Sequence, residues 1–360
     1  MSPGDGLRVE LQVVDSAEKH IRDILSIAIE YSDNHAAIVI ADARCDLAKT
    51  LTNAYRQCLP RAKFIDFDGV SPQAVLAALE PLTDSDLVVL IQSTNFRLEA
   101  FRIRVELFNR SLKVIEHPHL SSITDPEVPY YIDSLAYDPE YYRGVGSALK
   151  DRIDRAHGGV IDSGGEQLVF ASDFEPAKLN VGDYSKMKNI GGQFPIGEVF
   201  TEARDLESVN GRVRIFAFGD TTFRVHKPKK PITLVVNKGR VTTVLDSTPE
   251  FEQVLANIRA DEGEVWLREV GFGMNRAFTQ DRMVSDVGTY ERMCGIHLSL
   301  GAKHGVYKKP NFKRKEAKHH VDVFVITESV VLNDEAVYQN GAWQYLPLPG
   351  NTRQMSAPLL

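Results

Sequence analysis

Cysteine is scarce in this sequence of 360 residues, which contains three: Cys45, Cys58 and Cys294. Their number is odd and no two of them are spaced as CxxC, which excludes a disulfide framework and a cysteine-rich zinc module. We interpret them as reduced thiols, and this predicts a cytoplasmic location. The first residues, MSPGDGLRVELQVVD, lack a basic start and an apolar core, so we expect no secretory signal.

Long apolar runs and an excess of positive charge are also missing. No stretch approaches the roughly 20 apolar residues that cross a bilayer, so no membrane segment is expected. The formal net charge is −7, which argues against nucleic acid as a partner because phosphate binding favours a basic face. The first half of the chain has neither the GxGxxG nor the GxxxxGK[ST] pattern, so no nucleotide site is predicted there. The basic stretch KKPNFKRKEAK (308–318) is interpreted as a solvated loop, with docking of an anionic substrate group as the alternative.

The first half of the chain alternates short apolar runs with helix-like segments. The runs HAAIVIAD, AKFIDFD, SDLVVLIQS and LKVIEHP are expected strands. Helices are expected within 8–32 and at 47–59, 71–82 and 97–110. Such alternation predicts a parallel α/β sheet. Residues 121–142, rich in Pro, Tyr and Asp, are interpreted as a connection.

The second half has a different texture. A helix at 139–157 is expected to stop at Gly158-Gly159, after which short β-like runs are separated by Gly and Asp. ITLVVNKGRVTTVL predicts a hairpin whose turn residues with positive φ are Asn237 and Gly239. We also expect a helix from Thr248 to Arg259 and a terminal hairpin in VVLNDEAVYQNGAWQYL. Because the length exceeds one typical core, we predict an α/β domain at 1–150 and a β-rich α+β metal-binding domain at 151–360.

Metal-capable side chains gather in three strand-like segments between residues 264 and 328. LREVGFG carries Glu269, GIHLSLG carries His297, and HHVDVFV carries His320 and Asp322. Side chains alternate faces along a strand, so His320 and Asp322 point the same way while His319 points away. Imidazole and carboxylate suit zinc, manganese, cobalt or ferrous iron. The sequence therefore predicts a metal site.

Two more candidates lie outside these three segments. His304 follows His297 by seven residues, and Glu198 lies among apolar residues in PIGEVFTEA. A buried carboxylate needs a partner, so Glu198 is expected to bind either a metal or an arginine, whereas Glu202 is expected to be an exposed neighbour. The simpler alternatives are an Arg268–Glu269 pair at a strand edge and hydrogen-bonded core or loop histidines at positions 297 and 304.

Four of these segments resemble motifs of one family. PIGEVFTEA resembles the PTGEVFTAP motif of the aminopeptidase T family of metallopeptidases, and REVGFG lies where that family has a GEVALVP-like segment. GIHLSLGAKH is similar to its HLALGxAY motif, and HHVDVFV to its HxD strand. Order and approximate spacing agree over residues 185–327, while the first half matches only in its α/β character. The resemblance implies a homodimeric hydrolase that uses two divalent ions, such as zinc, cobalt or manganese, to cleave a small peptide or amide.

The same resemblance implies roles for individual residues. The implied metal ligands are Glu198, Glu269, His297, His320 and Asp322. His304 replaces the family's tyrosine, and a histidine can itself bind metal. Glu269 would bridge the two ions, and either Glu198 or Glu291 in TYERMCGIH would move the proton.

A related enzyme suggests a second function. The HxD strand and the preceding Lys/Arg-containing loop are similar to those of 2,5-dihydroxypyridine dioxygenase, which implies a mononuclear Fe(II) oxygenase acting on an aromatic or small natural-product substrate. That enzyme has a histidine at the position of Glu269 and lacks the counterparts of Glu198 and His297. Retention of these three residues favours the hydrolase. A metal-free binding protein on an inherited peptidase scaffold is the third alternative.

Overall fold

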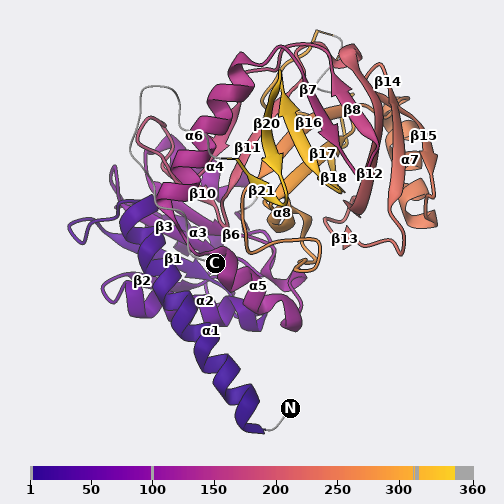
Figure 1. Cartoon of the computed structure of the whole chain (residues 1–360). Coiled ribbons are helices and arrows are strands. Elements are labelled where there is room, and N and C mark those ends of the chain that lie inside the picture. Colours follow the sequence, from indigo (N-terminus) through magenta and orange to yellow (C-terminus); the bar gives the residue numbers. More distant parts are fainter. Residues whose placement is uncertain (1–2, 99–100, 311, 313–315, 345–360) are drawn as a thin grey trace.

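The computed structural model describes residues 3–98, 101–310, 312 and 316–344, and its mixed α/β architecture confirms the predicted fold class (Figure 1). The α-helices are α1 (Pro3–Asp23), α2 (Asp46–Cys58), α3 (Pro72–Leu79), α4 (Ile103–Asn109), α5 (Val128–Ser134), α6 (Pro139–Arg155), α7 (Pro249–Glu262) and α8 (Val287–Tyr290). Short helical turns are η1 (Ile24–Ala28), η2 (Leu120–Ser122), η3 (Asp125–Glu127) and η4 (Leu206–Ser208).

The strands are distributed over both halves of the described chain. In the first half they are β1 (Ala37–Ala41), β2 (Lys63–Asp66), β3 (Leu87–Ile91), β4 (Arg97–Leu98), β5 (Phe101–Arg102) and β6 (Lys113–His117). In the second half they are β7 (Gly159–Asp162), β8 (Gln167–Phe170), β9 (Lys178–Asn180), β10 (Gly191–Gln193), β11 (Glu198–Glu202), β12 (Val209–Gly219), β13 (Val225–His226), β14 (Ile232–Asn237), β15 (Arg240–Leu245), β16 (Leu267–Gly273), β17 (Gly295–Leu300), β18 (Val321–Val325), β19 (Ser329–Leu332), β20 (Glu335–Gln339) and β21 (Ala342–Trp343).

The first sheet is parallel, with the strand order β10-β6-β3-β1-β2. Its central strands β1 and β3 are buried along their whole length, as in a parallel sheet covered by helices on both faces. Ser71 caps α3 by accepting a hydrogen bond from the amide of Ala74, as the Ser-Pro entry predicts. Strand β10 comes from the second half of the chain and pairs with β6, so it joins the two halves directly. The predicted division at residue 150 stays a prediction.

The second sheet is antiparallel and follows the order β21-β20-β19-β7-β8-β12-β18-β17-β16-β11-β9, with the hairpin β14-β15 attached to β12. Figure 1 shows this sheet beside the first one, with α7 on its outer side. The strands β16, β17 and β18 are neighbours and are fully buried. Strand β11 pairs with β16, so the four metal-capable segments lie on consecutive strands.

Several local predictions were wrong. In place of one long helix over 97–110, the described residues of this range form the small β4-β5 ribbon and the short α4, because Arg97 and Leu98 pair with Arg102 and Phe101, a contact that periodicity does not encode. The stretch 121–142 contains α5, which follows a capping box between Thr124 and Glu127.

Two boundaries also differ from the prediction. Helix α6 ends at Arg155, before the expected Gly158-Gly159 stop. The β14-β15 turn places positive φ at Lys238 and Gly239 rather than at Asn237, because a two-residue turn needs both central residues in that region.

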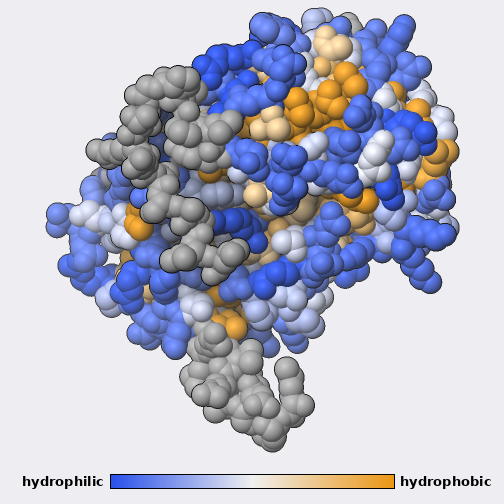
Figure 2. Space-filling view, in the orientation of Figure 1, coloured by the Kyte–Doolittle hydropathy of each residue, from blue (hydrophilic) through white to orange (hydrophobic). Residues whose placement is uncertain are grey.

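The face of the molecule shown in Figure 2 is mostly hydrophilic, and its apolar residues gather over the second sheet. Among the helices of the described residues, none is long and apolar enough to cross a membrane.

Candidate metal centre

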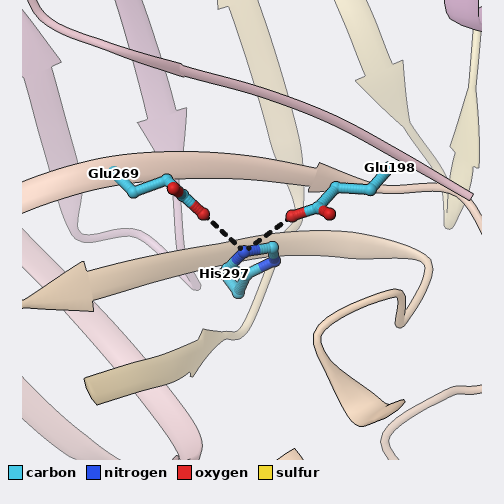
Figure 3. A group of neighbouring side chains, drawn as sticks. All are labelled: Glu198, Glu269 and His297. Atoms are coloured by element: carbon cyan, nitrogen blue, oxygen red, sulfur yellow. Dashed lines mark ion pairs between the residues drawn. The ribbon is translucent and has the colours of Figure 1, made fainter. Parts of the chain in front are cut away.

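Glu198, Glu269 and His297 approach one another between three adjacent strands. Their ligand-capable atoms all lie within 4.8 Å of one another, and all three residues are buried. The Nε2 atom of His297 lies 3.3 Å from Oε1 of Glu198 and 3.5 Å from Oε1 of Glu269. In Figure 3 the two carboxylates approach this imidazole from opposite sides. The structure therefore brings together three of the residues predicted to bind metal.

The surroundings of the His297 ring fit a metal ligand. Both ring nitrogens are buried, and neither has a hydrogen-bond partner among the described residues. Buried polar atoms normally have such partners, so an orphaned pair next to carboxylates fits a site that is completed by a ligand. Imidazole nitrogen and carboxylate oxygen suit a divalent transition metal.

The electrostatics favour positive charge at the same point. Burial alone would lower the pKa of His297, but the carboxylates of Glu198 and Glu269 outweigh it and raise this pKa to about 10. Burial would raise the pKa of Glu269, whereas His297 and His304 hold it well below its usual range. Carboxylates that stabilise imidazolium in this way would also stabilise a metal ion, since metal and protons compete for the same groups.

His304 extends the cluster on the other side of Glu269. Its Nε2 atom lies 3.0 Å from Oε2 of Glu269, and it is buried without a hydrogen-bond partner in the described chain. The two oxygens of Glu269 therefore face different histidines, Oε1 towards His297 and Oε2 towards His304. Each oxygen of Glu269 thus has a histidine nitrogen next to it.

His320 and Asp322 lie close together, as predicted for an HxD strand. Nε2 of His320 is 3.2 Å from Oδ1 of Asp322, which is buried and has no hydrogen bond among the described residues. Nδ1 of His320 lies 3.2 Å from the carbonyl oxygen of Lys303, a contact that orients the ring and leaves Nε2 towards Asp322. Burial opposes protonation of His320, yet Asp322 raises its pKa to about 9. His319 pairs instead with Asp261, in agreement with the prediction that it points to the other side of the strand.

The pair of Glu269 and His304 and the pair of His320 and Asp322 belong to one electrostatic cluster. The rings of His304 and His320 are 6.1 Å apart, and the charge of Glu269 contributes to the raised pKa of His320. The charge of Asp322 likewise contributes to the raised pKa of His297. All six residues predicted as metal ligands thus lie in one region, although the closest group comprises Glu198, Glu269 and His297.

Glu291 lies at the edge of this region. It follows α8 and forms an ion pair with Arg292, whose Nη2 atom is 3.8 Å from Oε2 of Glu198. Arg292 is buried, and its Nε atom has no hydrogen-bond partner in the described residues. The arginine therefore lies between the predicted proton carrier and the cluster. The catalytic role of Glu291 stays a prediction.

The expectation that Glu202 is exposed was wrong. Its side chain is fully buried and forms a two-pronged ion pair with Arg268, at 2.8 Å and 3.0 Å. Burial raises the pKa of Glu202, while Arg268 acts in the opposite direction. Arg268 therefore forms its ion pair with Glu202 and not with Glu269, the partner suggested as an alternative. The pairing of β16 with β17 shifts register between Leu267 and Val270, and such an irregularity can re-aim side chains in a way that simple alternation does not predict.

Residues 308–318 were interpreted as a solvated loop, but this interpretation is wrong for Lys309. Its side chain is buried, pairs with Glu175, and donates to the carbonyl oxygens of Ala203 and Arg204. A buried ammonium needs such partners, and the sequence does not reveal where they come from. Residues 313–315 of this basic stretch lie outside the described residues.

Gly271 is a site residue that the sequence reasoning missed. It lies directly opposite His297 in the β16-β17 pair, and a methyl group at this position would overlap the imidazole ring. The glycine thus provides the space in which His297 turns towards the two glutamates. An isolated glycine inside a strand is the available signal, because it often marks a close approach of other atoms.

We expect Gly271→Ala to weaken metal binding by at least about tenfold, since supporting residues of metal sites typically contribute factors of 10–100. Overpacking should also lower the free energy of unfolding by about 1–3 kcal/mol. Metal titration and denaturant unfolding measure the two effects. Gly69→Ala is the matched control, because its added methyl group would meet only the side chain of exposed Asp66. Unchanged metal affinity in Gly271→Ala would show that His297 does not need this space.

Comparisons with known proteins agree with the fold but assign no family. Neither the known protein families nor the curated proteins contain a match. Among solved structures, the chain is similar to the 2,5-dihydroxypyridine dioxygenase of Pseudomonas putida KT2440, with a TM-score of 0.59 and 14% identity over 93% of this chain and 97% of that one. It is also similar to wild-type AmpT from Thermus thermophilus, with a TM-score of 0.55 and 14% identity over 91% of this chain and 99% of that one. At this identity the likeness shows the fold alone, an arrangement that this chain shares with an aminopeptidase and a dioxygenase.

Proposed function

We propose that this chain is a metal-dependent hydrolase that cleaves a small peptide or amide by means of a metal-activated water. The observation that carries the proposal is the orientation of Glu269, whose two oxygens face two different buried histidines. A carboxylate with a nitrogen ligand on each side can hold two cations at a short separation. Paired divalent ions are a common device of hydrolytic enzymes.

The cluster divides into two sets of ligands around Glu269. Glu198 and His297 would hold one ion, and His304, His320 and Asp322 would hold the other. Zinc, cobalt or manganese at these positions would acidify a bound water and polarise the carbonyl of the substrate. His304 supplies a neutral nitrogen ligand, so the second set would have two imidazoles beside its carboxylates.

The residues around the cluster have supporting roles in this proposal. Glu291 would accept the proton of the attacking water: its side chain is about one-fifth exposed, and its ion-pair partner Arg292 reaches Glu198. Burial of the ligands limits water access and strengthens every electrostatic interaction within the site. A short peptide is the proposed substrate, and a homodimer in the cytoplasm is the proposed state of the protein.

A second function is favoured by one specific observation. His304, His320 and Asp322 lie close together and form a set of two histidines and one carboxylate, the ligand type of mononuclear ferrous oxygenases. The fold likeness to a dioxygenase is compatible with such chemistry. In this alternative the substrate would be an aromatic or small natural-product molecule.

Metal counting separates the two functions. The purified chain is stripped with a chelator, reloaded separately with zinc, cobalt, manganese or ferrous iron, and examined by elemental analysis after dialysis. About two zinc-like ions per chain, together with hydrolysis of amino-acid anilides, would support the hydrolase. About one iron per chain with oxygen consumption would support the oxygenase instead.

The variant His320→Ala/Asp322→Ala tests whether the metal resides in the cluster. Loss of at least one ion per chain is expected, because two of the proposed ligands are removed. Absence of metal binding by the wild type, or an unchanged metal content in the variant, would contradict both functions.

A further inference from the structure

A cavity lies at the carboxyl ends of β3 and β6, and its lining is separate from the candidate metal centre. Its volume is about 130 Å³, and its polar and aromatic wall includes Gln92, Arg104, Glu116, His119, Gln193 and Phe223. The crevice outside the carboxyl ends of parallel strands is where open α/β sheets bind their ligands. None of the metal-capable residues of the cluster lines this cavity.

The cavity wall presents one charge of each sign. Arg104 of α4 forms an ion pair with Glu116 of β6, and Gln92 donates a hydrogen bond of 2.9 Å to the other oxygen of that glutamate. Both charged side chains retain some exposure. A guanidinium has five N–H donors and a carboxylate has about four acceptor positions, so each can bind a ligand without giving up its present partner. Such a wall is complementary to a molecule that carries both a carboxylate and an ammonium group.

The remaining wall is apolar except for Asn95. Leu90, Phe96, Ile103 and Pro118 line it. An engineered apolar cavity of about 150 Å³ holds a benzene molecule, so this cavity accepts a group of similar or slightly smaller size. Phe223 is 55% exposed and lies at the mouth, where the cavity meets solvent. The size and lining favour a short aliphatic side chain.

The backbone next to the cavity is held in an uncommon conformation. His119 and Phe223 both have positive φ, 57° and 64°, and their rings lie 5.6 Å apart. Positive φ is rare for a bulky residue such as phenylalanine, and strain of this kind gathers at ligand-binding sites. His119 is also tied to the buried carboxylate of Asp286, at 3.2 Å, so the wall is built from both halves of the chain.

We propose that this cavity binds a free aliphatic α-amino acid, with its carboxylate on Arg104 and its ammonium group on Glu116. The inference goes beyond the proposed hydrolase and does not depend on it, because the binding residues are different. Nevertheless the two sites are close: Gln193 of the cavity and Arg292 beside Glu198 both donate to the carbonyl oxygen of Gly288. The carbonyl group of Gly288 therefore links a residue of the cavity wall to a residue that contacts the cluster.

Calorimetric titration of the metal-free full chain tests the proposal with three matched probes. L-Leucine carries both charges, 4-methylpentanoate lacks the ammonium group, and 3-methylbutylamine lacks the carboxylate. Leucine is expected to bind one site per chain in the millimolar range or tighter, and each analogue at least about tenfold more weakly. Equal binding of all three probes, or no binding of leucine, would overturn the proposal.

Variants locate the bound leucine. Arg104→Gln and Glu116→Gln should each weaken leucine binding at least about tenfold. Phe223→Gly should weaken it without disturbing the charge pair, which protects the test against misfolding of the charge variants. Val105→Ser is the matched control on α4, since Val105 is 55% exposed and does not line the cavity. His320→Ala/Asp322→Ala should bind leucine like the wild type, whereas loss of binding there would place leucine at the metal cluster and overturn the assignment.

Discussion

Replacing Glu269 by glutamine is expected to weaken metal binding by at least about 100-fold, because even residues that only support a metal ligand contribute factors of 10–100. Glu269 is the carboxylate whose oxygens face both His297 and His304, at 3.5 Å and 3.0 Å. Glutamine keeps the shape of the side chain but removes its charge and places an amide nitrogen on one side. A cation held beside either histidine would lose the carboxylate that both proposed ligand sets have in common.

Equilibrium dialysis with elemental analysis measures this loss, and thermal unfolding provides a second measurement. A ligand that binds only the folded state at 100 times its dissociation constant stabilises that state by about 2.7 kcal/mol, so added metal should raise the unfolding temperature of the wild type. The same metal concentration should barely shift the unfolding temperature of Glu269→Gln. Glu264→Gln provides the matched control, because that glutamate is exposed and lies just before the same strand. Equal metal affinity in the Glu269 and Glu264 variants would remove Glu269 from the site.

Hydrophobic patterning predicted the parts of the fold that depend on local sequence. The buried runs of β1 and β3 and the capped start of α3 follow from apolar spacing and from a Ser-Pro pair. The β4-β5 ribbon could not be predicted in this way, since it depends on pairing between Arg97 and Arg102. The place of β10 beside β6 is a contact between distant segments, and no local pattern encodes such a partner.

At the candidate site, too, some features follow from the local sequence and others depend on contacts between distant segments. That Glu198 needs a buried partner could be predicted from its apolar neighbours, whereas Glu269 and His297 were grouped with it through the similarity of their segments to family motifs. The sequence did not show that Glu202, four residues after Glu198, has its own partner in Arg268. Both glutamates lie in the same strand among apolar neighbours, so composition does not distinguish a metal ligand from a residue of an ion pair. Which cation reaches each carboxylate is decided by strand register and by the shift within β16.

Breaking the buried pair of Arg268 and Glu202 is expected to have the largest effect on stability. Both side chains are almost completely buried, at 1% and 0% exposure. Removing one partner leaves the other charge in the interior without its closest counter-charge, which typically costs about 3–5 kcal/mol. Without Arg268, Glu202 would keep only Lys309 and His304, each 3.9 Å away. Arg268→Met and Glu202→Gln should each lower the free energy of unfolding by this amount in urea denaturation. Arg61→Met breaks an exposed pair with Asp33 and should cost no more than about 1 kcal/mol.

The double variant Arg268→Met/Glu202→Gln distinguishes the lost pair from general damage to the core. Its destabilisation should be smaller than the sum of the two single effects, because no charge of the pair remains unpartnered. Metal affinity adds a second test, since Arg268 also donates to the carbonyl oxygens of Ala302 and Tyr307, on either side of His304. Arg268→Met should therefore weaken metal binding more than Glu202→Gln, which keeps these two hydrogen bonds. Strictly additive destabilisation with equal metal affinities would mean that the pair neither acts as a unit nor positions His304.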